Sequence, residues 1–326
     1  MLDLYCRRNG QWLEFDAIGY ALNAAQSSAS KELAVPQAGS HPHHLRQWLL
    51  ASSLFPEKWL GRLFSIGGIK WIDDRIGLLA FPAADVRKDP LYRKAEEKGR
   101  IGIEAQGARI EELVLYEDDY CLVLNKPAGI PVHASYDGQS GTLDDMAAAY
   151  LLQNGDPLPV RHIHRLDDET SGPVLYSKND LAQLRLDAAM REKAIDRKYV
   201  ALVEGAMKKS AGAVREPIGK DRHHPSRRRV TPSGDEAVTH YEVLQKLPEL
   251  TLVSVQLETG RTHQIRVHMS YIGHPLTGDS LYGGSPRWLS HQALHGEQLT
   301  FPHPLTGLMV NVQAPWPQWL ERLTKR

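Results

Sequence analysis

The chain has 326 residues, enough for two domains, and its 39 Lys plus Arg balance 39 Asp plus Glu. This balance excludes the overall basic charge of many nucleic-acid binders, so such a partner would need a local basic patch. Cys6 and Cys121 are the only cysteines, which argues against a disulfide framework or a thiolate metal site. With no apolar run near the ~18 residues of a membrane span and no signal-peptide core, we expect a cytoplasmic protein without a membrane partner.

The first hundred residues predict a small separate module. Residues 26–44, rich in Ser, Ala, Pro and His, indicate a loop. The following stretch, "LRQWLLASSLFPEKWLGRLFSIGGIKWIDD", predicts two amphipathic helices, a Gly-Gly turn and a strand. The strongly polar run 87–100 carries little that could be buried, so we place a linker there. The predicted domains are therefore an α/β module over residues 1–100 and a larger domain over residues 110–326.

The larger domain mixes strands and helices. "ELVLYEDDYCLVLNK" predicts two strands joined by an acidic turn, "PVLYSKN" another strand, and Asn179 or Asp180 a cap for the next helix. "KYVALVEG" predicts a further strand, and "AVTHYEVLQKL" with "LTLVSVQLETG" predicts a hairpin. After Gly260, helical spacing of apolar residues leaves Arg266 near the start of a helix and off its apolar face. This pattern favours an α+β fold with a mixed, mainly antiparallel central sheet.

Ionisable and hydroxyl groups are concentrated in "HRLDDETSG", residues 164–172. A metal site is one interpretation, with His162, His164, Asp167 and Asp168 as ligands and further histidines at 263 and 268. The spacing, however, departs from the His-x-His-x-Asp-His pattern of metallo-β-lactamase-like hydrolases. Paired-carboxylate catalysis is a second, although adjacent residues of an extended segment point to opposite faces. A solvated acidic turn is the third.

The same stretch resembles the signature of RluA-type pseudouridine synthases, His-Arg-Leu-Asp, two variable residues, then Thr-Ser-Gly. Four further segments are similar to that family, in its order: "LVLNKPAGIPVH", "RKYVALVEG", "LETGRTHQIRVHMSYIGHPLTGDSLYGG" and "ALHGEQLTFPHPLTG". The resemblance covers residues 110–326 and implies the pseudouridine synthase fold. It also implies an isomerase that acts on uridines of rRNA or tRNA.

The resemblance assigns three catalytic-site residues. Asp167 matches the family's catalytic aspartate, Arg266 the arginine that pairs with it, and Tyr199 the tyrosine that lies against the target base. The reaction moves the glycosidic bond from a ring nitrogen to a ring carbon without redox change, so no cofactor and no metal are expected. A carboxylate serves it either as nucleophile or as base, and both routes stay open. For Tyr199 the alternative is a core aromatic on a strand.

Other residues are candidates for RNA contact. Arg165 has a planar head that could fill the gap left by a flipped base; its alternatives are a phosphate contact or a surface ion pair. Lys126 either braces a strand end or touches RNA. His164, Thr170, Ser171, Gly172, Asp279 and Tyr282 are expected to be architectural.

A local basic patch occurs in "GKDRHHPSRRRV". Lys220, Arg222, Arg227, Arg228 and Arg229 there could follow an RNA backbone from a hairpin tip, or belong to a solvated loop. The family often has Gly-Lys-x-Ala after such a loop, and Asp235 stands in place of that lysine.

The N-terminal module resembles the small RNA-binding domain shared with a ribosomal small-subunit protein, although "IKWIDDRIG" replaces the expected V-x-V-N-G and the tryptophans would equally build a core. We expect a monomeric RNA pseudouridine synthase. The alternatives are a non-catalytic RNA-binding protein on the same scaffold and, third, a metal-dependent hydrolase.

Overall fold

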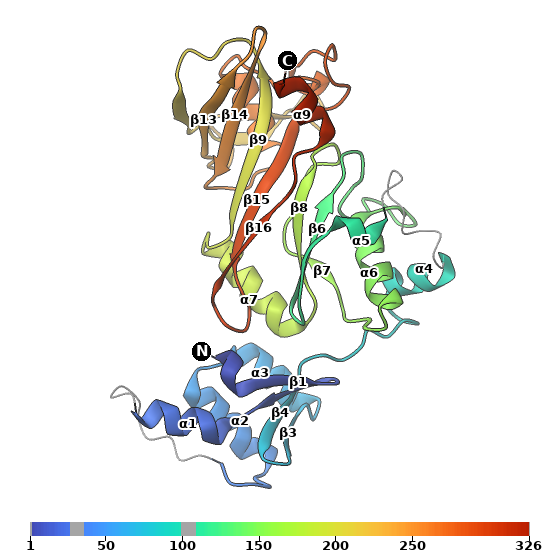
Figure 1. Ribbon diagram of the computed structural model, residues 1–326, viewed down its shortest axis with the longest axis vertical. Coiled ribbons are helices and arrows are strands. Elements are labelled where there is room, and N and C mark those ends of the chain that lie inside the picture. Colours follow the sequence, from blue (N-terminus) through green and yellow to red (C-terminus); the bar gives the residue numbers. More distant parts are fainter. Residues whose placement is uncertain (1, 27–35, 99–108, 326) are drawn as a thin grey trace.

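The computed structural model describes residues 2–26, 36–98 and 109–325 (Figure 1). The N-terminal part holds a four-stranded antiparallel sheet of order β1-β2-β4-β3 with helices α1, α2 and α3. The elements are η1 (Leu2–Tyr5), β1 (Cys6–Asn9), β2 (Trp12–Phe15), α1 (Ala17–Gln26), α2 (Pro42–Ser52), α3 (Glu57–Ser65), β3 (Ile69–Ile72) and β4 (Arg75–Leu79). The predicted helix-turn-helix-strand is confirmed. Part of the predicted 26–44 loop, residues 27–35, lies outside the described residues.

The predicted linker at 87–100 is partly wrong. It contains helix α4 (Pro90–Lys98), which packs on α6 (Leu143–Gln153). Tyr92 is fully buried among apolar residues of the larger part, and its hydroxyl donates to the carbonyl of Leu158. Tyr92 and Ala95, with the partly buried Leu91, are enough to dock a helix whose remaining residues are mostly charged.

Two antiparallel sheets form the larger part (Figure 1). The first has the order β5-β6-β8-β7 and the second β10-β13-β14-β9-β15-β16. The strands are β5 (Val114–Glu117), β6 (Cys121–Lys126), β7 (Arg161–His162), β8 (Gly172–Ser177), β9 (Asp196–Glu204), β10 (Ala211–Val214), β13 (Thr239–Lys246), β14 (Leu250–Leu257), β15 (Leu294–Pro302) and β16 (Met309–Gln313). Helices α5 (Ile110–Leu113), α7 (Asp180–Arg191), α8 (Gln264–Tyr271) and α9 (Gln318–Thr324), the turn η3 (Ser280–Tyr282) and a small ribbon of β11 (Ile218–Lys220) with β12 (Arg228–Val230) complete it.

The predicted strands, the β13–β14 hairpin and the helix carrying Arg266 are confirmed. Asn179 is the cap of α7, because its side chain accepts from the Ala182 N–H at 2.9 Å. The sheets are less mixed than expected. Within the described residues every strand ladder is antiparallel, and parallel pairing is confined to one isolated bridge, between Ser171 and His295.

That bridge joins the two sheets at the C-terminal end of the 164–172 segment. The Gly296 N–H donates to the Ser171 carbonyl at 2.8 Å, and a Cβ on Gly172 would lie 2.6 Å from the Gly296 backbone. Gly172 also has φ +129°, so only glycine fits there without strain. The close crossing fixes the start of β8, and with it the segment that precedes it.

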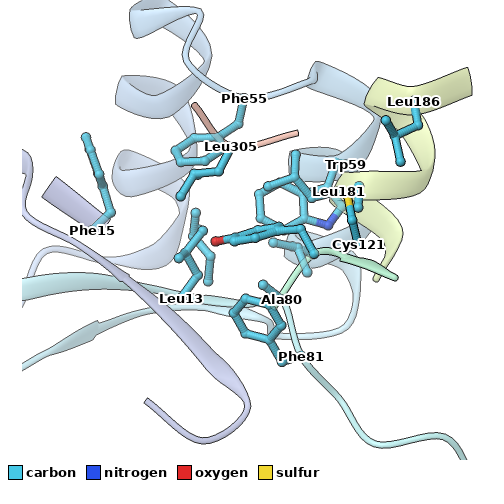
Figure 2. Packing of buried hydrophobic residues seen from close by; sticks show 14 of the residues in the cluster. Leu13, Phe15, Phe55, Trp59, Ala80, Phe81, Cys121, Leu181, Leu186 and Leu305 are labelled. Carbon is cyan, nitrogen blue, oxygen red and sulfur yellow. The ribbon is translucent and has the colours of Figure 1, made fainter. Parts of the chain in front are cut away.

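A shared apolar core joins the N-terminal part to the larger part. Figure 2 shows Leu13, Phe15, Phe55 and Trp59 in one buried cluster with Cys121, Leu181, Leu186 and Leu305. Polar contacts reinforce it: Arg8 pairs with Asp119 at 2.8 Å and Asp156 at 2.5 Å, and Arg185 on α7 donates to the Leu54 carbonyl. No described helix has the length and apolar character needed to cross a membrane.

Candidate active site

The segment 164–171 forms a braced turn between β7 and β8. The Thr170 N–H donates to the Asp167 carbonyl at 2.9 Å, which closes the turn. The His164 ring, which is buried, accepts from the Leu175 N–H of β8 at 3.2 Å, and the Ser171 hydroxyl bonds to His295 at 2.8 Å. Thr170, Ser171 and His164 therefore hold the turn that presents Asp167.

Lys126 supports the same turn through a hydrogen bond to the Asp168 carbonyl. Its ammonium donates to the carbonyls of Pro127 at 2.9 Å, Ile130 at 2.6 Å and Asp168 at 2.6 Å, and the side chain is 0% exposed. Burial lowers the pKa of Lys126 to about 8, although the nearby carboxylates of Asp168, Glu169 and Asp167 act in the opposite sense. All three donors are used, so its place among the RNA-contacting residues is corrected: in this structure it supports the loop.

Arg266 lies on α8 with its guanidinium between two carboxylates. Its Nη1 donates to Asp167 Oδ2 at 2.9 Å, whereas Nε and Nη2 donate to Asp279 at 2.7 Å and 2.9 Å. The two parallel hydrogen bonds that a guanidinium offers thus go to Asp279, and Asp167 receives a single one. Asp279 was expected to be only architectural, and its anchoring of Arg266 was missed because their pairing spans a loop.

The two neighbouring carboxylates stabilise the charge of Arg266 against the effect of burial. Burial disfavours the charged guanidinium, but the hydrogen bonds and charges of Asp279, with the charge of Asp167, outweigh it and raise the pKa of Arg266 above its usual value. The Asp279 side chain is 1% exposed and the Asp167 side chain 26%. Asp167 Oδ1 has no hydrogen-bond partner among the described residues. One carboxylate oxygen is therefore held and the other has no partner among the described residues, and Asp167 lines the open site.

His263 and Tyr282 complete the surroundings of Asp167. His263 Nε2 lies 3.8 Å from Asp167 Oδ2, and its Nδ1 bonds to the Tyr282 hydroxyl at 2.8 Å. The Tyr282 ring lies under the Arg266 guanidinium, 4.9 Å from ring centroid to Cζ. Burial lowers the pKa of His263 although the Asp167 charge raises it, so the imidazole is neutral at pH 7. Sequence reasoning considered His263 only as a metal ligand.

Tyr199 lies on β9 and faces the same site. It is buried and lines a small pocket with Leu166, Asp167, Leu257 and Arg266. Burial raises the pKa of Tyr199, so its hydroxyl stays protonated at neutral pH. The tyrosine is thus both a core residue and a wall of the pocket.

The pocket opens into a cleft of about 1260 Å³. The cleft is bounded by the 131–135 segment, the Asp167 turn, the end of α7 and the 256–263 segment, and it is large enough for several nucleotides. Arg165 is exposed on its wall, with a 3.4 Å contact between Nη1 and His133 Nε2.

The predicted basic hairpin is the β11–β12 ribbon. Arg222, Arg227 and Arg229 are exposed, and Arg228 is half-buried. The ribbon contacts Tyr282, which borders the site. The Arg228 N–H donates to the Tyr282 hydroxyl at 2.9 Å, and the Arg227 guanidinium lies 5.6 Å from the Tyr282 ring centroid. Its arginines are therefore near Asp167 but do not line the cleft.

The histidines considered as metal ligands bond elsewhere. His162 pairs with Asp144 at 3.1 Å, and His268 bonds to Thr239 and the Glu216 carbonyl. In the described part of the chain no group of three or more His, Cys, Asp or Glu side chains is arranged to hold a metal ion.

Comparisons with known proteins identify the class. Residues 119–271 match the family model described as RNA pseudouridylate synthase. An uncharacterised RNA pseudouridine synthase of Bacillus subtilis, YhcT, is 46% identical over 65% of this chain and 71% of its own length. Ribosomal large subunit pseudouridine synthase D of Pseudomonas aeruginosa is 35% identical over 85% of this chain and 91% of its own. A match of that extent is longer than residues 110–326 and reaches into the N-terminal part.

Solved structures agree with this. The structure of human RNA pseudouridylate synthase domain containing 4 has a TM-score of 0.54 and 26% identity over 66% of this chain and 94% of that one. The sequence and structure relationships together define an RNA pseudouridine synthase, an isomerase that converts uridine in RNA to pseudouridine, and the predicted α+β fold is confirmed. Within that class, the chain belongs to the RluA-type family.

Proposed function

We propose that this enzyme isomerises specific uridines of ribosomal or transfer RNA, with Asp167 acting on a uridine flipped into the cleft. The observation that carries the proposal is the Asp167 carboxylate, which lines the cleft with one oxygen held by Arg266 at 2.9 Å and the other without a partner among the described residues. The Arg266 guanidinium holds this carboxylate by a charge-assisted hydrogen bond. Relatives named for the large ribosomal subunit favour ribosomal RNA as the substrate.

The chemistry needs few groups. The bond from the sugar C1′ to ring N1 breaks, the base rotates, C1′ bonds to C5, the C5 proton leaves and N1 gains a proton. Asp167 acts either as the nucleophile towards C1′ or as a base towards the sugar. Tyr199 offers its ring to the base, and its protonated hydroxyl a hydrogen bond. Arg266 holds Asp167 in place, and Arg165 fills the vacated stack.

We also infer a division of labour along the chain. The catalytic domain comprises residues 110–326 together with the docked helix α4, and residues 2–79 form an accessory module. The contact of this module with α7 sets its orientation towards RNA. The shared apolar cluster and the Arg8 and Arg185 contacts support this inference. The exposed arginines of the β11–β12 ribbon add sequence-independent contacts to the RNA backbone.

Mapping of pseudouridine in total RNA tests the proposal. RNA from cells with and without the gene is compared at single-nucleotide resolution. One or a few pseudouridines in rRNA or tRNA should be absent without the gene and return with a plasmid copy. If no pseudouridine depends on the gene, a non-catalytic RNA-binding role replaces the proposal.

A further inference from the structure

Arg197 lies beside the catalytic group but was not singled out by sequence. It stands on β9 two residues before Tyr199, so both side chains project from the same face of the sheet. It lines the large cleft and also the small pocket that contains Asp167 and Arg266. Arg197 is therefore a cation at the junction of the two spaces.

The Arg197 guanidinium has no hydrogen-bond or ion-pair partner in the described part of the chain. None of its nitrogens makes a hydrogen bond or ion pair with a described residue, and its Nε is buried without one. The neighbouring acid, Asp196, instead accepts from Gln256 at 2.8 Å. By contrast, Arg266 spans two carboxylates and Arg261 donates to the Glu236 carbonyl. A half-buried cation left unpaired is costly unless a ligand supplies the charge.

The Arg197 guanidinium packs against Gly260. A Cβ on Gly260 would lie 3.1 Å from Nη2 and 3.3 Å from Nη1, so the guanidinium packs against the bare backbone of the 256–263 segment. The charge of Arg197 also affects the pKa values of two buried neighbours, His164 and Tyr199. The pKa of His164 is lowered to about 3, first by burial and then by Arg197, and Arg197 opposes the burial that raises the pKa of Tyr199. The cation therefore lies between the Gly260 backbone and the small pocket that contains Asp167.

We propose that Arg197 binds a backbone phosphate of the RNA strand at or next to the target nucleotide, which seats the flipped uridine between Tyr199 and Asp167. This inference rests on the proposed function. Phosphate fits better than a uracil oxygen because it neutralises the charge and accepts two parallel hydrogen bonds from the guanidinium. A phosphate contact near the reacting sugar would position C1′ against the free oxygen of Asp167.

The test measures tritium release from total RNA labelled with [5-³H]uridine in cells that lack the gene. Release reports only the targets of this enzyme, because other synthases have already removed tritium from theirs. The rates give kcat and KM at several salt concentrations for wild type, Arg197→Gln and Arg197→Lys. Lys198→Gln is the matched control, since Lys198 is the next residue on the opposite face and pairs with Glu297 at 3.6 Å.

Arg197→Gln should raise KM about tenfold, the usual effect of losing a charge-assisted contact. It should also reduce the slope of log KM against log salt by about 0.7, the value for one phosphate on a single strand. Arg197→Lys should keep the slope, and Lys198→Gln should behave as wild type. Because Arg197 has no polar partner among the residues that the structure describes, the thermal unfolding midpoint of Arg197→Gln should not fall below that of wild type.

An unchanged salt slope, with the loss confined to kcat, would overturn the phosphate contact and point to the base. A large drop in the unfolding midpoint would overturn it in favour of a structural role. If wild type releases no tritium, the proposed function fails, and the salt slope of equilibrium binding of the same RNA to wild type and Arg197→Gln then decides the phosphate contact separately.

Discussion

Arg266 separates two carboxylates that differ in exposure, and this asymmetry supports the different roles proposed for them. Asp279 is buried and takes the two parallel hydrogen bonds, so it fixes the guanidinium. Asp167 takes one and faces the cleft. Asp279 thus anchors the guanidinium, and Asp167 is the acid that we propose to meet the substrate.

Asp279→Asn should weaken this arrangement. An asparagine amide group would face a guanidinium N–H, and the buried guanidinium would lose the carboxylate that takes two of its hydrogen bonds, which costs about 3–5 kcal/mol of unfolding free energy. The misplaced Arg266 should also lower kcat by ~100-fold. Urea unfolding and tritium release measure the two effects, with exposed Asp235→Asn as control. Full activity of Asp279→Asn would refute the anchoring role.

At the scale of elements, the turn that carries Asp167, residues 164–171, is positioned by contacts with residues that are distant in sequence. Local patterns predict the β13–β14 hairpin, α7 with its Asn179 cap and α8, because periodicity and capping are visible within a short window. The Gly172–Gly296 crossing and the Arg266–Asp279 pair were not predicted, because sequence patterns carry no information on which distant segments meet. The docking of α4 depends on so few apolar residues that composition alone indicated a linker.

His164 makes the turn before β8 sensitive to acid. Its ring accepts a hydrogen bond from Leu175 N–H and must stay neutral, and burial lowers its pKa from 6.5 to about 3. The unfolded chain therefore binds the proton first, and stability is lost as pH falls through 6.5 towards 3. Between pH 7 and pH 5, this group should remove about 2 kcal/mol of unfolding free energy.

Urea unfolding of wild type and His164→Asn at both pH values measures this difference. Asparagine keeps an acceptor but does not titrate, so its loss between pH 7 and pH 5 should be smaller than that of wild type by about 2 kcal/mol. Equal losses in the two proteins would show that His164 is protonated in the folded state.

At the scale of the whole molecule, the N-terminal part and the larger part share one apolar cluster (Figure 2). Trp59 on α3 belongs to it together with Leu181 and Leu186 on α7, which leads into β9 and the Tyr199 wall of the pocket. The orientation of the accessory module is therefore coupled to the element that borders the cleft.

Trp59→Ala should destabilise both sides of this contact. A cavity of that size in a core costs about 3–5 kcal/mol. Hydrogen exchange should accelerate in α7 and β6 as well as in α3, whereas Phe64→Ala on the more exposed face of α3 should leave α7 unchanged. Acceleration confined to residues 2–79 would show that the two parts are energetically independent.

The central claim is that the free oxygen of Asp167 carries the reaction. Single-turnover tritium release compares Asp167→Asn with Asp168→Asn, whose exposed side chain is next in sequence but has no contact with Arg266. Asp167→Asn should release tritium only at the background rate while its RNA affinity stays near that of wild type, and Asp168→Asn should retain most of the activity. Release by Asp167→Asn at an undiminished rate would contradict the account.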